Sequence, residues 1–144
     1  MIINSRDNSF PIKINLVVCN NKKAYGINYA KKYRIPYILI NTKMRNYENK
    51  ILLYLKKYKI SFICLAGYMR IVSEKIINNY RKRIINIHPS LLPKFKGLDT
   101  FSRVLKSKEI KTGCTVHFVN KKLDSGSTVT QKIFYIEPED NVKD

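Results

Sequence analysis

The stretch RIINIHPSLLPKFKG, residues 83–97, joins a short apolar run to a loop punctuated by two prolines. Residues 83–88 predict a strand, in which Asn86 and His88 lie two positions apart and therefore point to one face. Ile85 and Ile87 point to the other face, which we expect to be the core between sheet and helices. Taken alone, an Asn-x-His pair is explained equally well by side chains that satisfy backbone groups of the following loop.

Outward from this stretch, short apolar runs alternate with amphipathic segments, as in βα units around a parallel sheet. We expect Asn20 and Asn21 to cap the first helix and Ser73 to cap the third. The second helix should bury Tyr47, Ile51, Tyr54, Leu55 and Tyr58 on one face and expose its lysines. The expected strands are 13–19, 37–40, 61–66, 83–88, 113–119 and 128–136, and the expected helices lie at about 20–32, 47–58, 73–80 and 100–107.

Length and composition limit the class of protein. A chain of 144 residues with 44% hydrophobic residues fits one globular domain, residues 1–144, and is too apolar for a disordered polyelectrolyte. No apolar run reaches the roughly 20 residues of a membrane helix, and the first residues lack a signal-peptide pattern. We therefore expect a cytoplasmic protein. Its three cysteines are far apart and lie in apolar stretches, which predicts free, buried thiols.

The charge is strongly positive, with 28 basic and 10 acidic side chains and a formal net charge of +18. Such a balance fits a polyanionic partner, whether nucleic acid or a phosphorylated substrate. The lysines are nevertheless spread along the chain, as on a solvated surface, so nucleic acid is not the expected partner. A basic RNA-binding protein remains an alternative, and it would interleave aromatic residues with arginines on one exposed face.

The polar residues gather where an open α/β sheet binds its ligands, beyond the carboxyl ends of the strands. Three loops follow strands in this way, after Ala66, after His88 and after Val119. The sequence therefore predicts a site built from these three loops.

Four segments together indicate a family. LAGYMRI (65–71), INIHPSLLPKFKG (85–97), TGCTVHFV (112–119) and LDSG (123–126) occur in the order and approximate spacing of glycinamide ribonucleotide formyltransferases. From about Ile14 to Glu137 the chain resembles this branch of the folate-dependent formyltransferases. The HPSLLP core is shared widely among formyl-transfer domains, while CTVHFV and the Gly-Leu-x-Thr pattern indicate the purine enzyme.

The resemblance implies a fold and a reaction. The fold is α/β, a doubly wound, mostly parallel, Rossmann-like sheet that ends in an antiparallel strand. The reaction moves a formyl group from 10-formyltetrahydrofolate to the amine of glycinamide ribonucleotide, without a metal. Asn86 and a protonated His88 would stabilise the oxyanion of the tetrahedral intermediate. Asp124 would hold His88 charged and help a water to move the proton.

The resemblance also implies a folate pocket. One wall would be the loop of Met69, Arg70, Ile71 and Val72, and Asn86 would face the bound cofactor. The opposite wall would be the loop of Asn120, Lys121, Lys122, Leu123 and Asp124. Thr115 matches a small hydroxyl residue near the catalytic water, whereas His117 reads as a packed, structural histidine.

The chain departs from the family at the ribonucleotide side. It lacks the first strand with its Gly-Ser-rich phosphate loop and the C-terminal helix, so we expect a form shortened at both ends. Asp99 stands where a histidine next to the phosphate is usual, and DSGS (124–127) replaces DTGP. Alternatives are a sibling formyl-transfer or deformylase domain, or a degenerate, inactive remnant. An exposed strand edge at residues 13–19 predicts a monomer or a weak homodimer.

Overall fold

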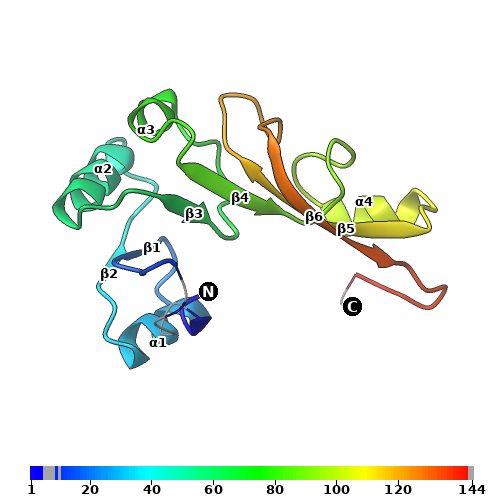
Figure 1. Ribbon diagram of the computed structural model, residues 1–144, viewed down its shortest axis with the longest axis horizontal. Helices are drawn as coiled ribbons and strands as arrows, with labels where there is room; N and C mark the ends of the chain where they lie inside the picture. The colour runs from blue at the N-terminus through cyan, green and yellow to red at the C-terminus, as the bar shows by residue number, and fades with distance from the viewer. Residues whose placement is uncertain (5–8, 10, 143–144) are drawn as a thin grey trace. The chain divides into compact units, whose positions relative to one another are not determined.

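The computed structural model describes residues 1–4, 9 and 11–142. The chain divides into two compact units, Met1–Ile60 and Ser61–Asp144, and each is described by itself. Figure 1 follows the chain through both units from its N-terminus to its C-terminus.

The first unit is a βαβα segment. Its two strands pair in parallel, with Val17 opposite Tyr37, and Ile27 and Ala30 of the intervening helix are buried. Ile40, directly after the second strand, is also buried. The elements are β1 (Val17–Cys19), α1 (Tyr25–Lys32), β2 (Tyr37–Leu39) and α2 (Tyr47–Lys57).

The predicted cap of the first helix is wrong. Helix α1 begins at Tyr25 after Ala24, and no side chain caps it. Asn21 instead accepts a hydrogen bond from the backbone N–H of Lys23 at 2.9 Å, which closes a local turn before the helix. An asparagine side chain satisfies a turn as readily as a helix N-terminus, so the sequence did not separate the two.

Helix α2 confirms the predicted periodicity. Leu55 is buried, and the four other residues of the predicted face are half-buried. Lys50, Lys56 and Lys57 are exposed, and the last two lie in the final turn, where they complement the helix dipole.

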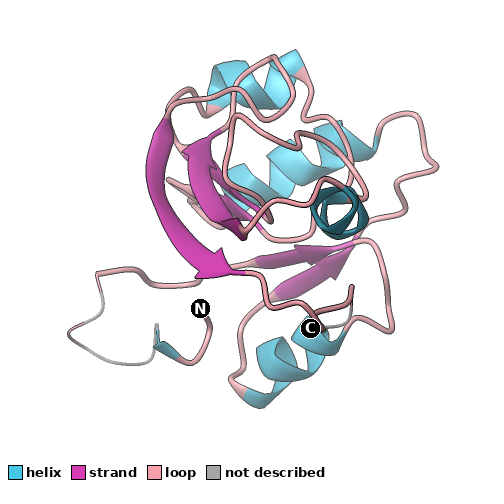
Figure 2. Cartoon of the chain, turned by 90° about the vertical axis from the view of Figure 1, so that its right-hand side faces the viewer, coloured by secondary structure: helices cyan, strands magenta, loops and turns pink. Residues whose placement is uncertain are grey.

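The second unit contains a four-stranded sheet in the order β3-β4-β5-β6. Strands β3 and β4 are parallel, whereas β4–β5 and β5–β6 are antiparallel, so the sheet is mixed. Figures 1 and 2 show these strands side by side, with the long β6 at one edge. The elements are β3 (Ile63–Leu65), α3 (Glu74–Asn79), β4 (Ile84–His88), α4 (Thr100–Lys106), β5 (Lys111–Phe118) and β6 (Thr128–Tyr135).

Two details of this unit test local predictions. Ser73 caps α3 as expected, because its hydroxyl accepts a hydrogen bond from the Ile76 N–H at 3.4 Å. The expected assignment of the two faces of β4 is wrong. Ile84 is 1% exposed and His88 5% exposed, whereas Ile87 is 50% exposed. The face that carries Asn86 and His88 is therefore the more buried one, because loops fold over it.

The strands of the described residues form two sheets, β1–β2 and β3–β6. Within those residues, no strand pairs with β1 on its side away from β2 or with β3 on its side away from β4. The absence of the family's first strand stays a prediction, as does the single domain.

The cysteines are free, as predicted, but half-buried rather than buried. Burial raises the pKa of the Cys64 thiol on β3, which keeps it protonated at neutral pH.

In the described part of the chain, no helix is long and apolar enough to cross a bilayer.

Candidate active site

The pairing of β4 with β5 brings the polar side chains together. Asn86 lies opposite His117, and His88 lies opposite Thr115. Residues opposite each other in an antiparallel pair point to the same face. The two predicted catalytic residues of β4 therefore share a face with a threonine and a second histidine.

Asp124 reaches this face from the loop between β5 and β6. Its backbone has a φ of 44°, in the left-handed region that Asp tolerates better than most residues. Gly126 follows where the loop passes against the Phe118 carbonyl, and a Cβ at this position would overlap that group. The Phe118 N–H donates to the Ser127 carbonyl at 2.9 Å and closes the loop. The loop geometry thus aims the Asp124 carboxylate at β4.

The carboxylate of Asp124 is the centre of a polar cluster. Its Oδ2 lies 3.4 Å from Nδ1 of His88 and accepts a 2.9 Å hydrogen bond from the Gly97 N–H. Its Oδ1 lies 3.6 Å from Nε2 of His117. The three charged or ionisable side chains are at most 9% exposed. Weak solvent screening at such burial strengthens their mutual interactions.

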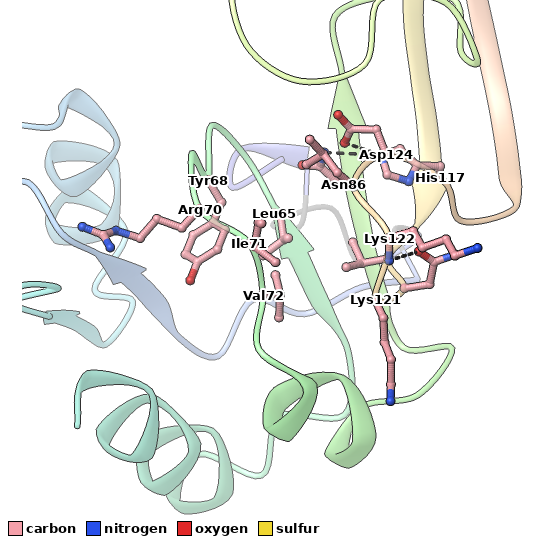
Figure 3. A pocket seen from close by; sticks show the side chains of 13 residues that line it. Leu65, Tyr68, Arg70, Ile71, Val72, Asn86, His117, Lys121, Lys122 and Asp124 are labelled. Carbon is pink, nitrogen blue, oxygen red and sulfur yellow. Dashed lines mark hydrogen bonds and ion pairs between the residues drawn. The ribbon is translucent and has the colours of Figure 1, made fainter. Parts of the chain in front are cut away.

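Asn86 completes the cluster, and its amide nitrogen lies 3.4 Å from Nε2 of His117. Figure 3 shows Asn86, His117 and Asp124 grouped at one side of a pocket. His88 is not among the residues that line this pocket, because its Nε2 contacts the Phe95 carbonyl at 2.9 Å and the ring is 5% exposed.

The pocket is lined by the two loops that the family resemblance predicts to bind folate. All of the predicted cofactor-binding residues except Met69 line it, and Met69 is 72% exposed. Their role in binding stays a prediction. The lining residues on the predicted list are Arg70, Ile71, Val72, Asn86, Asn120, Lys121, Lys122, Leu123 and Asp124; Leu65, Tyr68, His117 and Val119 also line the pocket.

The chemistry of the pocket changes from one side to the other. Aliphatic side chains such as Leu65 and Val72 lie next to the polar cluster (Figure 3), and the residues Arg70, Lys121 and Lys122 also line the pocket. The Lys121 ammonium pairs with Glu74 at 2.8 Å, and both side chains are largely exposed. The pocket thus combines apolar side chains with hydrogen-bonding groups at one side, and cationic residues are part of its lining.

A hydrogen-bond network fixes the loop that follows β4. Thr115 is fully buried, and its hydroxyl donates to the Ser90 carbonyl at 2.6 Å. The same oxygen accepts from the Leu92 N–H at 3.0 Å and from the Gln131 amide at 2.9 Å. The family resemblance placed Thr115 near a catalytic water; in the structure its hydroxyl is committed to this loop.

We expect Thr115→Val to lower the free energy of unfolding by about 1–3 kcal/mol, because it leaves the Leu92 N–H and the Ser90 carbonyl without their partner. Thr130→Val, on the exposed β6, makes the same chemical change without a buried network and should alter stability little. Urea unfolding of both variants measures the difference. Equal stability of the two variants would contradict a structural role for this hydroxyl.

His117 lies closer to the candidate site than its sequence predicts. It is 2% exposed, as expected of a packed histidine, but it also lines the pocket and contacts both Asn86 and Asp124. A signal was present, since Thr115 and His117 are two apart on a strand, as Asn86 and His88 are. The register that joins the two pairs could not be read from either strand alone.

At the expected ribonucleotide side, Asp99 adopts a φ of 54° and precedes α4 without a side-chain cap. The Lys96 ammonium donates to the Ser125 hydroxyl at 2.7 Å, and the Arg103 guanidinium donates to the Lys96 carbonyl at 2.6 Å. The first contact ties the loop before α4 to the loop that carries Asp124, and the second ties that loop to α4. Among the described residues, no group of three or more His, Cys, Asp or Glu side chains is arranged to hold a metal ion.

The sheet, the polar cluster on β4 and β5 and the pocket beside it are features of a known class of protein. The chain belongs to the formyl transferase family, whose model matches residues 1–144. It is 39% identical over 140 residues to the phosphoribosylglycinamide formyltransferase of Haemophilus influenzae, covering 93% of this chain and 65% of that protein. It is 34% identical to the human trifunctional purine biosynthetic protein adenosine-3, covering 99% of this chain and 14% of that protein.

Solved structures agree with the sequence comparison. The crystal structure of phosphoribosylglycinamide formyltransferase from Bacillus halodurans matches with a TM-score of 0.92 and 33% identity, over 99% of this chain and 76% of that chain. This likeness confirms the predicted α/β formyltransferase fold. The chain spans 65% of the length of the Haemophilus enzyme, slightly less than two thirds.

Proposed function

We propose that this protein transfers a formyl group from 10-formyltetrahydrofolate to the primary amine of glycinamide ribonucleotide, a step of purine synthesis. Membership of the formyl transferase family supports the proposal, as do relatives named phosphoribosylglycinamide formyltransferase. The observation that carries it is the cluster of Asn86, His117 and Asp124 in the lining of a pocket that is otherwise aliphatic and cationic. We further propose that it acts in the cytoplasm as a single domain, as a monomer or weak homodimer.

The pocket suits a formyl folate. A pterin is flat, with polar atoms along its edge, and Leu65, Val72 and Leu123 supply apolar surface for its faces. Backbone groups of the 69–72 and 120–124 loops would bind the pterin edge. The folate tail carries carboxylates, and the positive groups of Arg70 and Lys122 would attract them. Bound in this way, the formyl group would lie beside the polar cluster.

The cluster supplies the groups that formyl transfer needs. Attack of the ribonucleotide amine on the formyl carbon forms a C–N bond and moves an electron pair onto the formyl oxygen. The Asn86 amide would donate a hydrogen bond to that oxyanion. Asp124, acting through a water, would take the proton from the attacking amine and deliver it to the departing folate nitrogen as the old C–N bond breaks.

His88 would support the same oxyanion from its place on β4. In the structure its Nε2 is engaged with the Phe95 carbonyl at 2.9 Å, so a direct contact requires that nitrogen to exchange the carbonyl for the substrate oxygen. Catalytic hydrogen bonds often form only in the substrate complex. A hydrogen bond from this ring would be strengthened because the site is largely shielded from water.

The test is an assay of formyl transfer with the full chain, 10-formyltetrahydrofolate and glycinamide ribonucleotide, alongside His88→Ala. We expect transfer by the wild type and a fall in kcat of about 10²- to 10⁴-fold in the variant, because a charged donor is lost. Equilibrium binding of a folate analogue, with circular dichroism, should show that the variant is folded and still fills the pocket.

Other results would contradict the proposal. Release of formate from 10-formyltetrahydrofolate without glycinamide ribonucleotide would indicate a deformylase. A folded wild type that binds the analogue but transfers nothing would indicate an inactive remnant that retains the folate site. RNA binding that weakens steeply with salt, without binding of the analogue, would favour the RNA-binding alternative.

A further inference from the structure

One row of side chains crosses the strands β4, β5 and β6. His88 on β4 lies opposite Thr115 on β5, and Thr115 lies opposite Gln131 on β6. Residues opposite each other in antiparallel strands point to the same face. Gln131 therefore shares a face with His88, although it does not line the pocket and lies outside the four segments that carry the family resemblance.

The side chain of Gln131 bonds to the loop that follows β4. Its amide nitrogen lies 3.0 Å from the Leu92 carbonyl oxygen and 2.9 Å from the Thr115 hydroxyl oxygen. A backbone carbonyl only accepts hydrogen bonds, so the nitrogen of this amide, and not its oxygen, must face Leu92. A main-chain partner thus fixes the orientation of the amide, and its two N–H groups serve the two contacts.

The Thr115 hydroxyl is fully used once Gln131 is bound. It gives its one hydrogen to the Ser90 carbonyl at 2.6 Å and accepts the Leu92 N–H at 3.0 Å. Each of these main-chain groups has a single possible role, so the remaining lone pair of the hydroxyl accepts from Gln131. Because the Gln131 side chain is exposed, water can replace its donors after a substitution. Stability should then change little, while the loop loses a fixed attachment.

The loop carries this attachment to His88. The Ser90 side chain is fully buried, and its hydroxyl donates to the Lys94 carbonyl at 2.7 Å. The next residue, Phe95, presents its carbonyl to Nε2 of His88 at 2.9 Å. The loop is therefore bonded internally, with Gln131 holding its beginning and the His88 ring contacting its end.

We propose that Gln131 is a positioning residue for formyl transfer: by holding the loop at Leu92, it sets the place of the Phe95 carbonyl and, through it, of the His88 ring. The inference rests on the proposed function, in which His88 supports the oxyanion. A displacement of about 1 Å in such a site can cost about 10²-fold in rate. Asp124 also faces the ring, at 3.4 Å, so we expect a smaller loss when Gln131 is changed.

Gln131→Met tests this role, because methionine keeps the length of the side chain and removes both donors. Lys132→Met is the matched control, since it places the same side chain one position along β6, on the other face, where the Lys132 ammonium lies over the Phe134 ring. We expect Gln131→Met to lower kcat about tenfold with little change in the KM for formyl folate, because the pocket lining is untouched. Lys132→Met should match the wild type.

A double-mutant cycle with His88→Ala separates positioning from a general effect on the fold. If Gln131 acts through His88, adding Gln131→Met to His88→Ala should lower kcat by no more than about twofold. A tenfold loss in that background would place the effect elsewhere, on Asp124 through the Gly97 N–H or on the whole fold, and would overturn the proposal. So would a rise in KM with kcat unchanged, or equal losses in Gln131→Met and Lys132→Met.

The His88 ring can also be followed by NMR, without turnover. The chain has two histidines, so the ring C–H spectrum holds two sets of signals and His88→Ala assigns both. We expect Gln131→Met to move the His88 signals by more than those of His117, and Lys132→Met to move neither. Unchanged His88 signals in Gln131→Met would overturn the positioning role even in an active enzyme. A wild type without formyl transfer would instead overturn the proposed function, while the spectrum still shows whether Gln131 holds the ring.

Discussion

Asp124→Asn is expected to reduce formyl transfer by about 10³- to 10⁴-fold. The substitution removes a negative charge that faces both histidines at 3.4 and 3.6 Å. It also removes the base that would carry the proton from the attacking amine to the folate nitrogen. A neutral amide leaves the cluster without its negative charge and without its base, so the loss should appear in kcat rather than in folate binding.

The choice of asparagine keeps the local fold intact. Asp124 accepts a hydrogen bond from the Gly97 N–H, and an amide oxygen at the same position can accept it too. Asp140→Asn is the matched control, because Asp140 likewise accepts a backbone N–H, that of Glu137 at 2.9 Å, outside the pocket. Rapid-quench measurement of a single turnover would isolate the chemical step. Retention of more than about a tenth of the wild-type rate by Asp124→Asn would remove Asp124 from the proton path.

Much of the fold could be predicted because its signals are local. The buried face of α2 follows from the spacing of Ile51, Leu55 and Tyr58, and the start of α3 follows from the serine at its cap. The ends of elements were less well predicted. Strand β1 covers Val17–Cys19 rather than the whole apolar run from residue 13. Where a strand stops depends on the length of its partner, and β2 has three residues as well.

The faces of β4 could not be predicted by the same reasoning. An isoleucine is the more apolar neighbour of an asparagine, yet Ile87 is exposed and the asparagine–histidine face is covered. The covering comes from segments distant along the chain, the loop that places the Phe95 carbonyl on His88 and the loop that carries Asp124. Alternation along a strand identifies two faces, but the rest of the fold decides which is buried.

The candidate site, too, could be predicted only in part from the sequence. Asn86, His88 and Asp124 were proposed from a motif, and the structure brings them into one cluster. The motif did not give the contacts of each histidine ring, since those involve the backbone carbonyls of Phe95 and Phe118. A motif names side chains, whereas their contacts depend on segments distant along the chain.

Asn86→Asp is expected to impair formyl transfer more than Asn86→Ala does, although it is the smaller change in shape. Removal of one oxyanion donor costs about 10²- to 10³-fold in kcat, and alanine should show that loss. Aspartate removes the donor and also places a negative charge where the oxyanion forms, so we expect at least about a further tenfold loss.

Asn41→Asp is the control for the added charge. Asn41 accepts the Lys43 N–H at 3.0 Å in an exposed turn of the first unit, and a carboxylate there keeps this bond. Its kcat should equal that of the wild type. If the Asp and Ala variants of Asn86 are impaired equally, the amide acts by shape and not as an oriented donor. If the Asp variant is the more active of the two, a carboxylate is tolerated beside the formyl oxygen, and the oxyanion is stabilised elsewhere.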